Sequence, residues 1–200
     1  MPIELLNWLL SPEAVSAAAL LIFMAGLSDG IGSQGVTLLI NRITPLRFVL
    51  GLLASAALFL VSAALWVAAL WLSVRTLYGV SVPLALFFVA VSAAYGPLLL
   101  GALRLLPLIG TPIWVLLRLW SFGAALASIQ AVTGLGFWQA ALGALGGTLL
   151  LAGASWLLSE PAAAVGGRLW ALVTGRPRPL ERSAPPLVIP GYEPAIEVEP

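Results

Sequence analysis

Cysteine, histidine and lysine are all absent from this chain of 200 residues. Without cysteine the chain has no disulfides and no thiolate zinc sites, and without histidine it has no imidazole metal ligands. Activation of a serine or threonine nucleophile by a histidine base is excluded as well. We therefore expect a protein that is not an enzyme and that holds no cofactor and no metal.

Charged residues are scarce, at 8% of the chain against about 25% in ordinary globular domains. All nine basic residues are arginine, and the formal net charge is +1. A protein that binds nucleic acid needs a basic stripe that neutralises phosphates, and the sequence contains no such stripe. We therefore expect no nucleic-acid partner.

Apolar residues, in contrast, make up 61% of the chain and include four long runs. The runs cover residues 48–74, 80–103, 112–132 and 137–158. A helix needs about 20 apolar residues to cross the hydrocarbon core of a bilayer, and each run reaches that length. The runs lack the period-two alternation of barrel strands, so we expect helices. Pro97 lies inside the second run and should kink it.

The N-terminal part is harder to interpret, because its apolar run at residues 14–27 is short. A polar, glycine-rich stretch follows at 28–35, and then a second apolar patch at 36–40. A short first span, a re-entrant hairpin and a helix lying in the interface all fit this pattern. We favour a short or tilted span with a continuation weakened by glycine. The predicted fold is an all-α polytopic transmembrane bundle with five spans, or with four plus an interfacial or re-entrant N-terminal segment.

The sequence divides into four regions. Residues 1–47 form the N-terminal short span or interfacial segment, and residues 48–158 form a four-helix transmembrane core. Residues 159–173 are expected to lie in the interface. Residues 174–200 are rich in proline, which predicts a disordered tail.

The arginines predict the orientation of the bundle. Arg42, Arg47 and Arg104 fall on one side of the membrane if all the long runs cross, together with the four arginines that follow the last run. Only Arg75 falls on the other side. The positive-inside rule then predicts a cytoplasmic C-terminus. We expect an integral protein of a bacterial inner membrane or a thylakoid membrane.

Two charged residues at membrane depth are candidates for function, because charge is expensive to hold there. Asp29 could carry protons in a transporter, or it could be an interfacial residue at a break in the helix. Arg118 lies about 9 Å into its span by helical rise. Its side chain could reach the cytoplasmic headgroups, or it could pair with Asp29 or with an anionic lipid headgroup.

Small residues spaced four apart are typical of helices that approach closely. Gly143 and Gly147 form such a pair on the last span, and similar pairs occur at Gly26–Gly30 and at Gly123–Ala127. We expect Gly143 and Gly147 to pack helices together, within the chain or in a homo-oligomer.

An apolar cluster in the proline-rich tail is a candidate for binding a partner. It comprises Leu187, Val188, Ile189 and Tyr192, and it follows a segment rich in arginine and proline. An extended motif of this kind can dock in a groove or against a sheet edge. We expect the cluster to bind another membrane protein.

The central and C-terminal spans resemble the bacterial branch of the Yip family of multi-span membrane proteins. The resemblance covers roughly residues 45–158. It is carried by residues 94–101 (Ala-Tyr-Gly-Pro-Leu-Leu-Leu-Gly), 106–110 (Leu-Pro-Leu-Ile-Gly), Trp114, 119–121 (Leu-Trp-Ser) and the turn at 134–141. The segment 27–53 is similar to cyanobacterial membrane proteins of this type. The resemblance implies a non-enzymatic role in membrane organisation or trafficking, and it assigns no catalytic residue.

Two functions follow as expectations. The first is a membrane scaffold or assembly factor that binds the lipid bilayer and other membrane proteins. The alternative is a subunit of a small-solute or ion transporter that uses Asp29 and Arg118. The two differ in whether Asp29 and Arg118 face an interior cavity or the headgroups.

Overall fold

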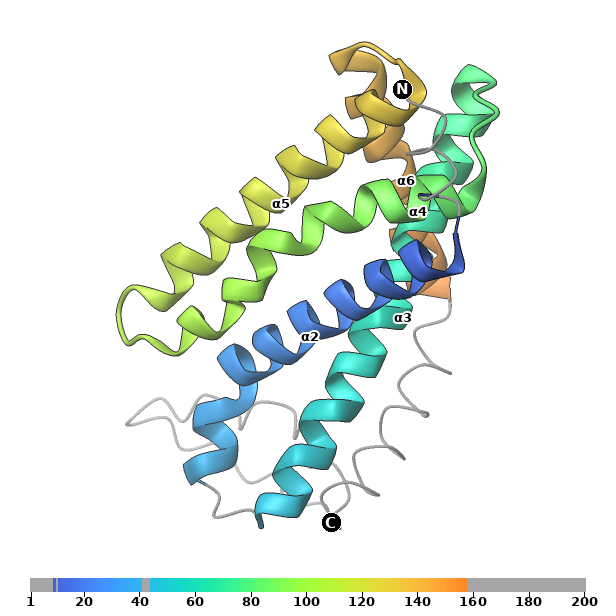
Figure 1. Ribbon diagram of the computed structural model, residues 1–200. Helices are drawn as coiled ribbons and strands as arrows, with labels where there is room; N and C mark the ends of the chain where they lie inside the picture. The colour runs from blue at the N-terminus through green and yellow to red at the C-terminus, as the bar shows by residue number, and fades with distance from the viewer. Residues whose placement is uncertain (1–8, 10, 41–43, 158–200) are drawn as a thin grey trace, which may run out of the picture.

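The computed structural model describes residue 9 and residues 11–40 and 44–157 of the chain. Every regular element in this part of the chain is a helix (Figure 1). The elements are α2 (Pro12–Ile40), α3 (Pro45–Tyr78), α4 (Leu84–Ser92), the 3₁₀ helix η1 (Ala93–Leu105), α5 (Gly110–Thr133) and α6 (Phe137–Leu157). The segments predicted at 159–173 and 174–200, with the cluster Leu187, Val188, Ile189 and Tyr192, lie outside the described residues.

Five helical segments are long and apolar enough to cross a membrane. They are Pro12–Ser33 of α2, all of α3, the joined α4 and η1 at Leu84–Leu105, all of α5, and Phe137–Trp156 of α6. The predicted all-α bundle with five spans is therefore confirmed. At about 1.5 Å per residue, the 34 residues of α3 extend about 50 Å, which exceeds the hydrocarbon thickness of roughly 30 Å. This helix must tilt or project beyond the hydrocarbon.

The N-terminal helix is longer and more regular than the sequence indicates. We expected glycine to weaken it at 28–35, yet α2 continues without a break to Ile40, so Asp29 does not lie at a helix break. Tertiary contacts explain the difference, because Gly26 lies against Phe59 of α3 and Gly30 against Leu52. Close packing there offsets the low helix propensity of glycine.

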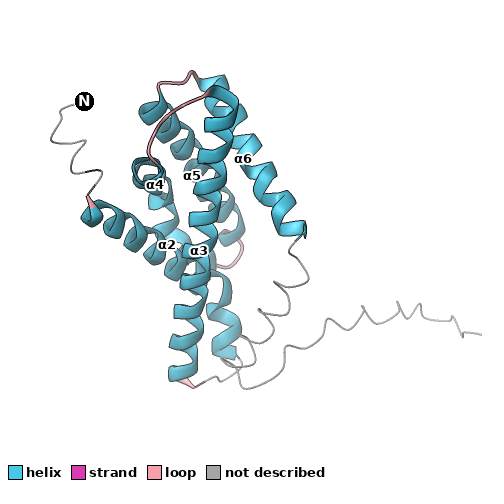
Figure 2. Cartoon of the chain, turned by 90° about the vertical axis from the view of Figure 1, so that its right-hand side faces the viewer, coloured by secondary structure: helices cyan, strands magenta, loops and turns pink. Residues whose placement is uncertain are grey.

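The helices form a bundle whose main buried core lies between α3, α4, the start of η1, α5 and α6. α5 packs on η1, η1 on α2, α2 on α3, and α3 on α6. Figure 1 shows η1 between α5 and α2, and Figure 2 shows α3 between α2 and α6. α5 and α6 are in less extensive contact than these four pairs of neighbours, although both contribute to the buried core.

Glycines set the close crossing of α6 and α3. A Cβ at Gly147 would lie 2.6 Å from Cα of Leu70, and one at Gly143 would lie 2.7 Å from Cγ2 of Val74. Both distances are too short for a side chain, so Gly143 and Gly147 allow the two backbones to approach. A Cβ at Gly123 would meet nothing within 4 Å, so this glycine marks no close helix contact among the described residues.

The third span changes from an α-helix to a 3₁₀ helix halfway along its length. It is α-helical to Ser92 and a 3₁₀ helix from Ala93 to Leu105, with Pro97 inside the 3₁₀ segment. Such long 3₁₀ segments are uncommon, and within a helix they often mark a hinge or a sequence under strain. The sequence predicted a kink at Pro97, whereas the structure shows a change of helix type that starts four residues earlier.

Candidate intramembrane binding site

A cavity of about 350 Å³ lies between the helices near the middle of the bundle. Each of four spans contributes a hydroxyl within about two residues of its own midpoint. This common position indicates that the cavity lies deep in the bilayer. The lining residues are Phe59, Ser62, Ala63 and Trp66 of α3, Tyr95 and Leu98 of η1, Arg118, Ser121 and Phe122 of α5, and Thr148 of α6.

Aromatic rings form much of the cavity wall. Tyr95 is only 6% exposed, and its ring meets the rings of Phe59 and Trp66 edge to face, with centroids 5.8 Å and 6.3 Å away. The indole of Trp66 also donates a hydrogen bond to the hydroxyl of Thr148 at 3.3 Å. Apolar walls with a few fixed polar groups are typical of small-molecule binding sites.

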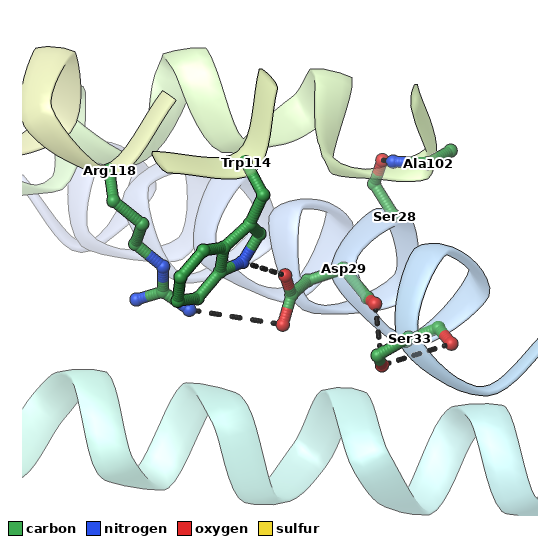
Figure 3. A network of polar contacts seen from close by, with 7 residues as sticks. Ser28, Asp29, Ser33, Ala102, Trp114 and Arg118 are labelled. Atoms are coloured by element: carbon green, nitrogen blue, oxygen red, sulfur yellow. Dashed lines mark hydrogen bonds and ion pairs between the residues drawn. The ribbon is translucent and has the colours of Figure 1, made fainter. Parts of the chain in front are cut away.

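Among the described residues that line this cavity, Arg118 is the only charged one. Its side chain is 43% exposed, and its Nη2 atom lies 3.9 Å from Oδ2 of Asp29, whose side chain is 19% exposed (Figure 3). That separation is too long for a good hydrogen bond and corresponds to a weak ion pair. The structure thus brings together the two residues that the sequence singled out, one from α2 and one from α5.

Trp114 holds this pair in place, as Figure 3 shows. Its indole N–H donates to Oδ1 of Asp29 at 3.3 Å. The guanidinium carbon of Arg118 lies 5.2 Å from the centre of the indole ring, and that of Arg104 lies 5.0 Å from it. Both distances fall in the range of cation–π contacts. Asp29 and the two arginines therefore meet around one tryptophan.

The crossing of α2 and η1 positions Asp29. A Cβ at Gly101 would lie 3.1 Å from Cα of Asp29, and one at Gly32 would overlap the carbonyl oxygen of Gly101. Next to Asp29, the hydroxyl of Ser28 donates to the carbonyl of Leu99 at 2.7 Å. The same hydroxyl accepts from the amide of Ala102 at 2.9 Å. In a regular 3₁₀ helix these two backbone groups would be joined directly.

The sequence did not indicate most of the remaining site. Trp114 is one helical turn before Arg118, and this spacing could have suggested a stacked pair. Tyr95 and Thr148 carry no comparable signal, since their meeting depends on how separate spans pack. In the described part of the chain, no three of His, Cys, Asp and Glu gather where they could hold a metal.

Searches of protein-family models, curated proteins and solved structures find no match to this chain. The resemblance to the Yip family therefore rests on the residues quoted for it, and function has to be inferred from the site itself.

Proposed function

We propose that the protein binds an anionic molecule in the mid-membrane cavity and acts as a subunit of a transport system. The observation that carries this proposal is the position of Arg118, which lines the cavity while it pairs only weakly with Asp29. An intramembrane arginine is costly to keep, and such residues commonly mark substrate pathways. An entering anion can replace Asp29 as the partner of the guanidinium.

The interrupted third span supports a transport role. Binding sites of secondary transporters are typically built near the bilayer centre from discontinuous helices. Here the change from α4 to η1 occurs beside Tyr95, which lines the cavity. A 3₁₀ segment has poorer hydrogen-bond geometry than an α-helix, so it can change conformation at lower cost.

The experiment that tests this proposal uses the natural absence of cysteine. In a Ser62→Cys variant, the single thiol would line the cavity. Its rates of reaction with an anionic and a cationic methanethiosulfonate of similar size are then compared. We expect the anionic reagent to react faster. The Arg118→Gln change should reduce that preference by about tenfold, because Arg118 supplies the local positive potential.

A Leu119→Cys variant is the matched control, because Leu119 is 65% exposed on α5 and does not line the cavity. Its thiol should face lipid and react with neither reagent. If the thiols at positions 62 and 119 are equally unreactive, the cavity is dry and the transport proposal fails. If the anionic reagent still reacts faster in the Arg118→Gln variant, that result also contradicts the transport proposal.

A second candidate function is the scaffold or assembly factor, and a groove on the outer side of α3 and α6 favours it. The groove has a volume of about 670 Å³ and includes Gly153, where a Cβ would meet nothing within 4 Å. Small residues in such a groove suit a helix of another membrane protein or of a second copy. The groove is lined by Ser73, Thr76, Leu77, Gly146, Leu149, Leu150, Gly153 and Ala154.

Co-purification distinguishes this second function. A Gly153→Leu variant should lose partner proteins if the groove binds them, and deletion of residues 183–200 should release partners that bind through Ile189 and Tyr192. Gly153 does not line the cavity, so labelling at position 62 should be unaffected by Gly153→Leu. Partners that survive both changes would remove the support for a scaffold of this kind.

A further inference from the structure

The arginine pair around Trp114 points to the chemical class of the ligand. We propose that the site binds a phosphate-bearing anionic amphiphile, such as an anionic phospholipid. Its phosphate would lie on Arg104 and Arg118, and its apolar part would extend into the cavity. This inference rests on the proposed function, since it names the substrate class of the same site.

The first support is a local excess of positive charge. Arg104 and Arg118 share one indole, with their guanidinium carbons 5.0 Å and 5.2 Å from its centre, so the two carbons lie at most 10.2 Å apart. Within the described residues, the only acids are Glu13 and Asp29, and Glu13 lies in the first turn of α2, far along the helix from Asp29. Among the described residues, the one carboxylate at this site pairs with Arg118, while Arg104 lies on the same tryptophan, so a net positive charge is left for a ligand to neutralise.

The second support is the way in which the indole presents the two guanidiniums. A guanidinium that stacks on an indole by its face keeps the N–H groups at its edge available, apart from the Nη2 group of Arg118 that pairs with Asp29. Those N–H groups match phosphate oxygens in bidentate geometry. Arg104 is exposed and Arg118 is 43% exposed, so an anion can reach both.

The third support is the arrangement of polar and apolar parts along the span. Trp114 is close to the start of α5, and Arg104 is close to the end of η1, so the charged end of the site lies where these helices meet their connecting turn. Ser121 lines the cavity seven residues further along α5, about 10 Å deeper by helical rise. A ligand that uses both parts must be charged at one end and apolar at the other.

Access from the bilayer also fits an amphiphile. Phe122 lines the cavity and is 43% exposed, so the cavity wall continues onto the outer, lipid-facing surface of α5. An acyl chain could enter sideways there while its headgroup stays at the interface. A small hydrophilic anion would gain little from the apolar wall formed by Phe59 and Leu98.

The experiment is a lipid-binding measurement on the full-length protein in detergent micelles, by native mass spectrometry. Phosphatidylglycerol and phosphatidylcholine of identical acyl chains are added in turn. We expect phosphatidylglycerol to bind about tenfold more tightly or better, and the Arg104→Gln and Arg118→Gln changes each to remove most of that preference.

Arg75→Gln is the matched control, because Arg75 also stacks on a tryptophan, with its guanidinium carbon 4.9 Å from the ring centre of Trp71, at the opposite end of the bundle. This change should leave the preference intact. Equal binding of the two lipids, or an equal loss with Arg75→Gln, would overturn the proposal. Because Arg104 is exposed and lies outside the cavity lining, its variant tests the site even if Arg118→Gln fails to fold.

Inorganic phosphate, added as a competitor, separates the two sources of the anion. Little displacement of phosphatidylglycerol indicates a site for an amphiphile, whereas full displacement at millimolar phosphate indicates a site for free phosphate and overturns the proposal. The outcome is independent of thiol labelling at position 62. If labelling at position 62 depends on Arg118 but the protein does not prefer phosphatidylglycerol, only the ligand class is refuted. If the protein prefers phosphatidylglycerol but the thiol at position 62 does not react, only the transport proposal is refuted.

Discussion

The hydroxyl of Ser121 donates a hydrogen bond of 2.6 Å to the backbone carbonyl of Ala94. In a 3₁₀ helix this carbonyl would accept from the residue three positions later, which is Pro97, and proline has no N–H to give. A side chain from α5 thus satisfies the backbone group that a proline in η1 leaves without its regular donor. The interrupted span is held in place by its neighbour.

The first prediction follows from this contact. Ser121→Ala should lower the free energy of unfolding by about 1 kcal/mol, because it leaves the buried Ala94 carbonyl without that donor. The loss can be measured by SDS-induced unfolding in mixed micelles. In a Pro97→Ala background the new N–H can serve the same carbonyl, so the cost of Ser121→Ala should shrink. Equal costs in both backgrounds would show that Ser121 and Pro97 are not coupled.

The second prediction compares two glycines on α6. Gly147→Ala should destabilise the protein by about 1–3 kcal/mol, since the added Cβ would lie 2.6 Å from Cα of Leu70 and force α6 away from α3. Gly153→Ala should be neutral or should stabilise by up to about 1 kcal/mol, because it adds helix propensity in open space. The same unfolding titration applies to both variants. A similar cost at the two positions would mean that α6 does not cross α3 as described.

The five spans could be predicted because hydropathy reports the solvent around each segment, and the four long runs reach bilayer length without help from packing. The continuity of α2 could not, since Gly30 and Gly32 weaken a helix in isolation and only the contacts with α3 and η1 compensate. The start of η1 at Ala93 was also out of reach. The backbone of η1 is bonded by groups from other helices, namely the hydroxyls of Ser28 on α2 and Ser121 on α5.

The candidate site, too, could be predicted from the sequence only in part. Asp29 and Arg118 stood out in the sequence because charge inside a membrane is rare, and their pairing was one of the alternatives considered. The cavity beside them did not stand out. Tyr95 and Thr148 look ordinary within apolar runs, and their contribution depends on the relative rotation of three spans, which a largely uniform apolar surface does not encode.

The third prediction concerns orientation. In Leu108→Cys the thiol would lie in the turn between η1 and α5, where Leu108 is 98% exposed, and in Ser81→Cys it would lie in the exposed turn before α4. Arg47 and Arg104 lie at the end of the bundle that carries Leu108, so a membrane-impermeant maleimide should label position 81 in intact cells, and position 108 only after permeabilisation. Both positions should label equally once the membrane is opened. The reverse pattern would contradict the orientation expected from the arginines.

The last prediction concerns Asp29 and separates charge from hydrogen bonding. Asp29→Asn removes the carboxylate charge but keeps an oxygen that can accept from the indole of Trp114. Because the contact with Arg118 is 3.9 Å long and partly exposed, we expect the free energy of unfolding to fall by less than about 1 kcal/mol. Asp29→Leu also removes the acceptor and should cost more, by about the value of one hydrogen bond.

The Asp29→Asn variant also tests the competition between Asp29 and an incoming anion. With its carboxylate partner neutralised, Arg118 should attract anions more strongly. Asp29→Asn should therefore increase the rate at which the anionic thiol reagent modifies position 62 while leaving the cationic reagent no faster. A uniform change with both reagents would indicate a general loosening of the bundle. A slower anionic reaction would mean that Asp29 helps to admit the ligand, which is the opposite of the displacement expected from the weak Asp29–Arg118 contact.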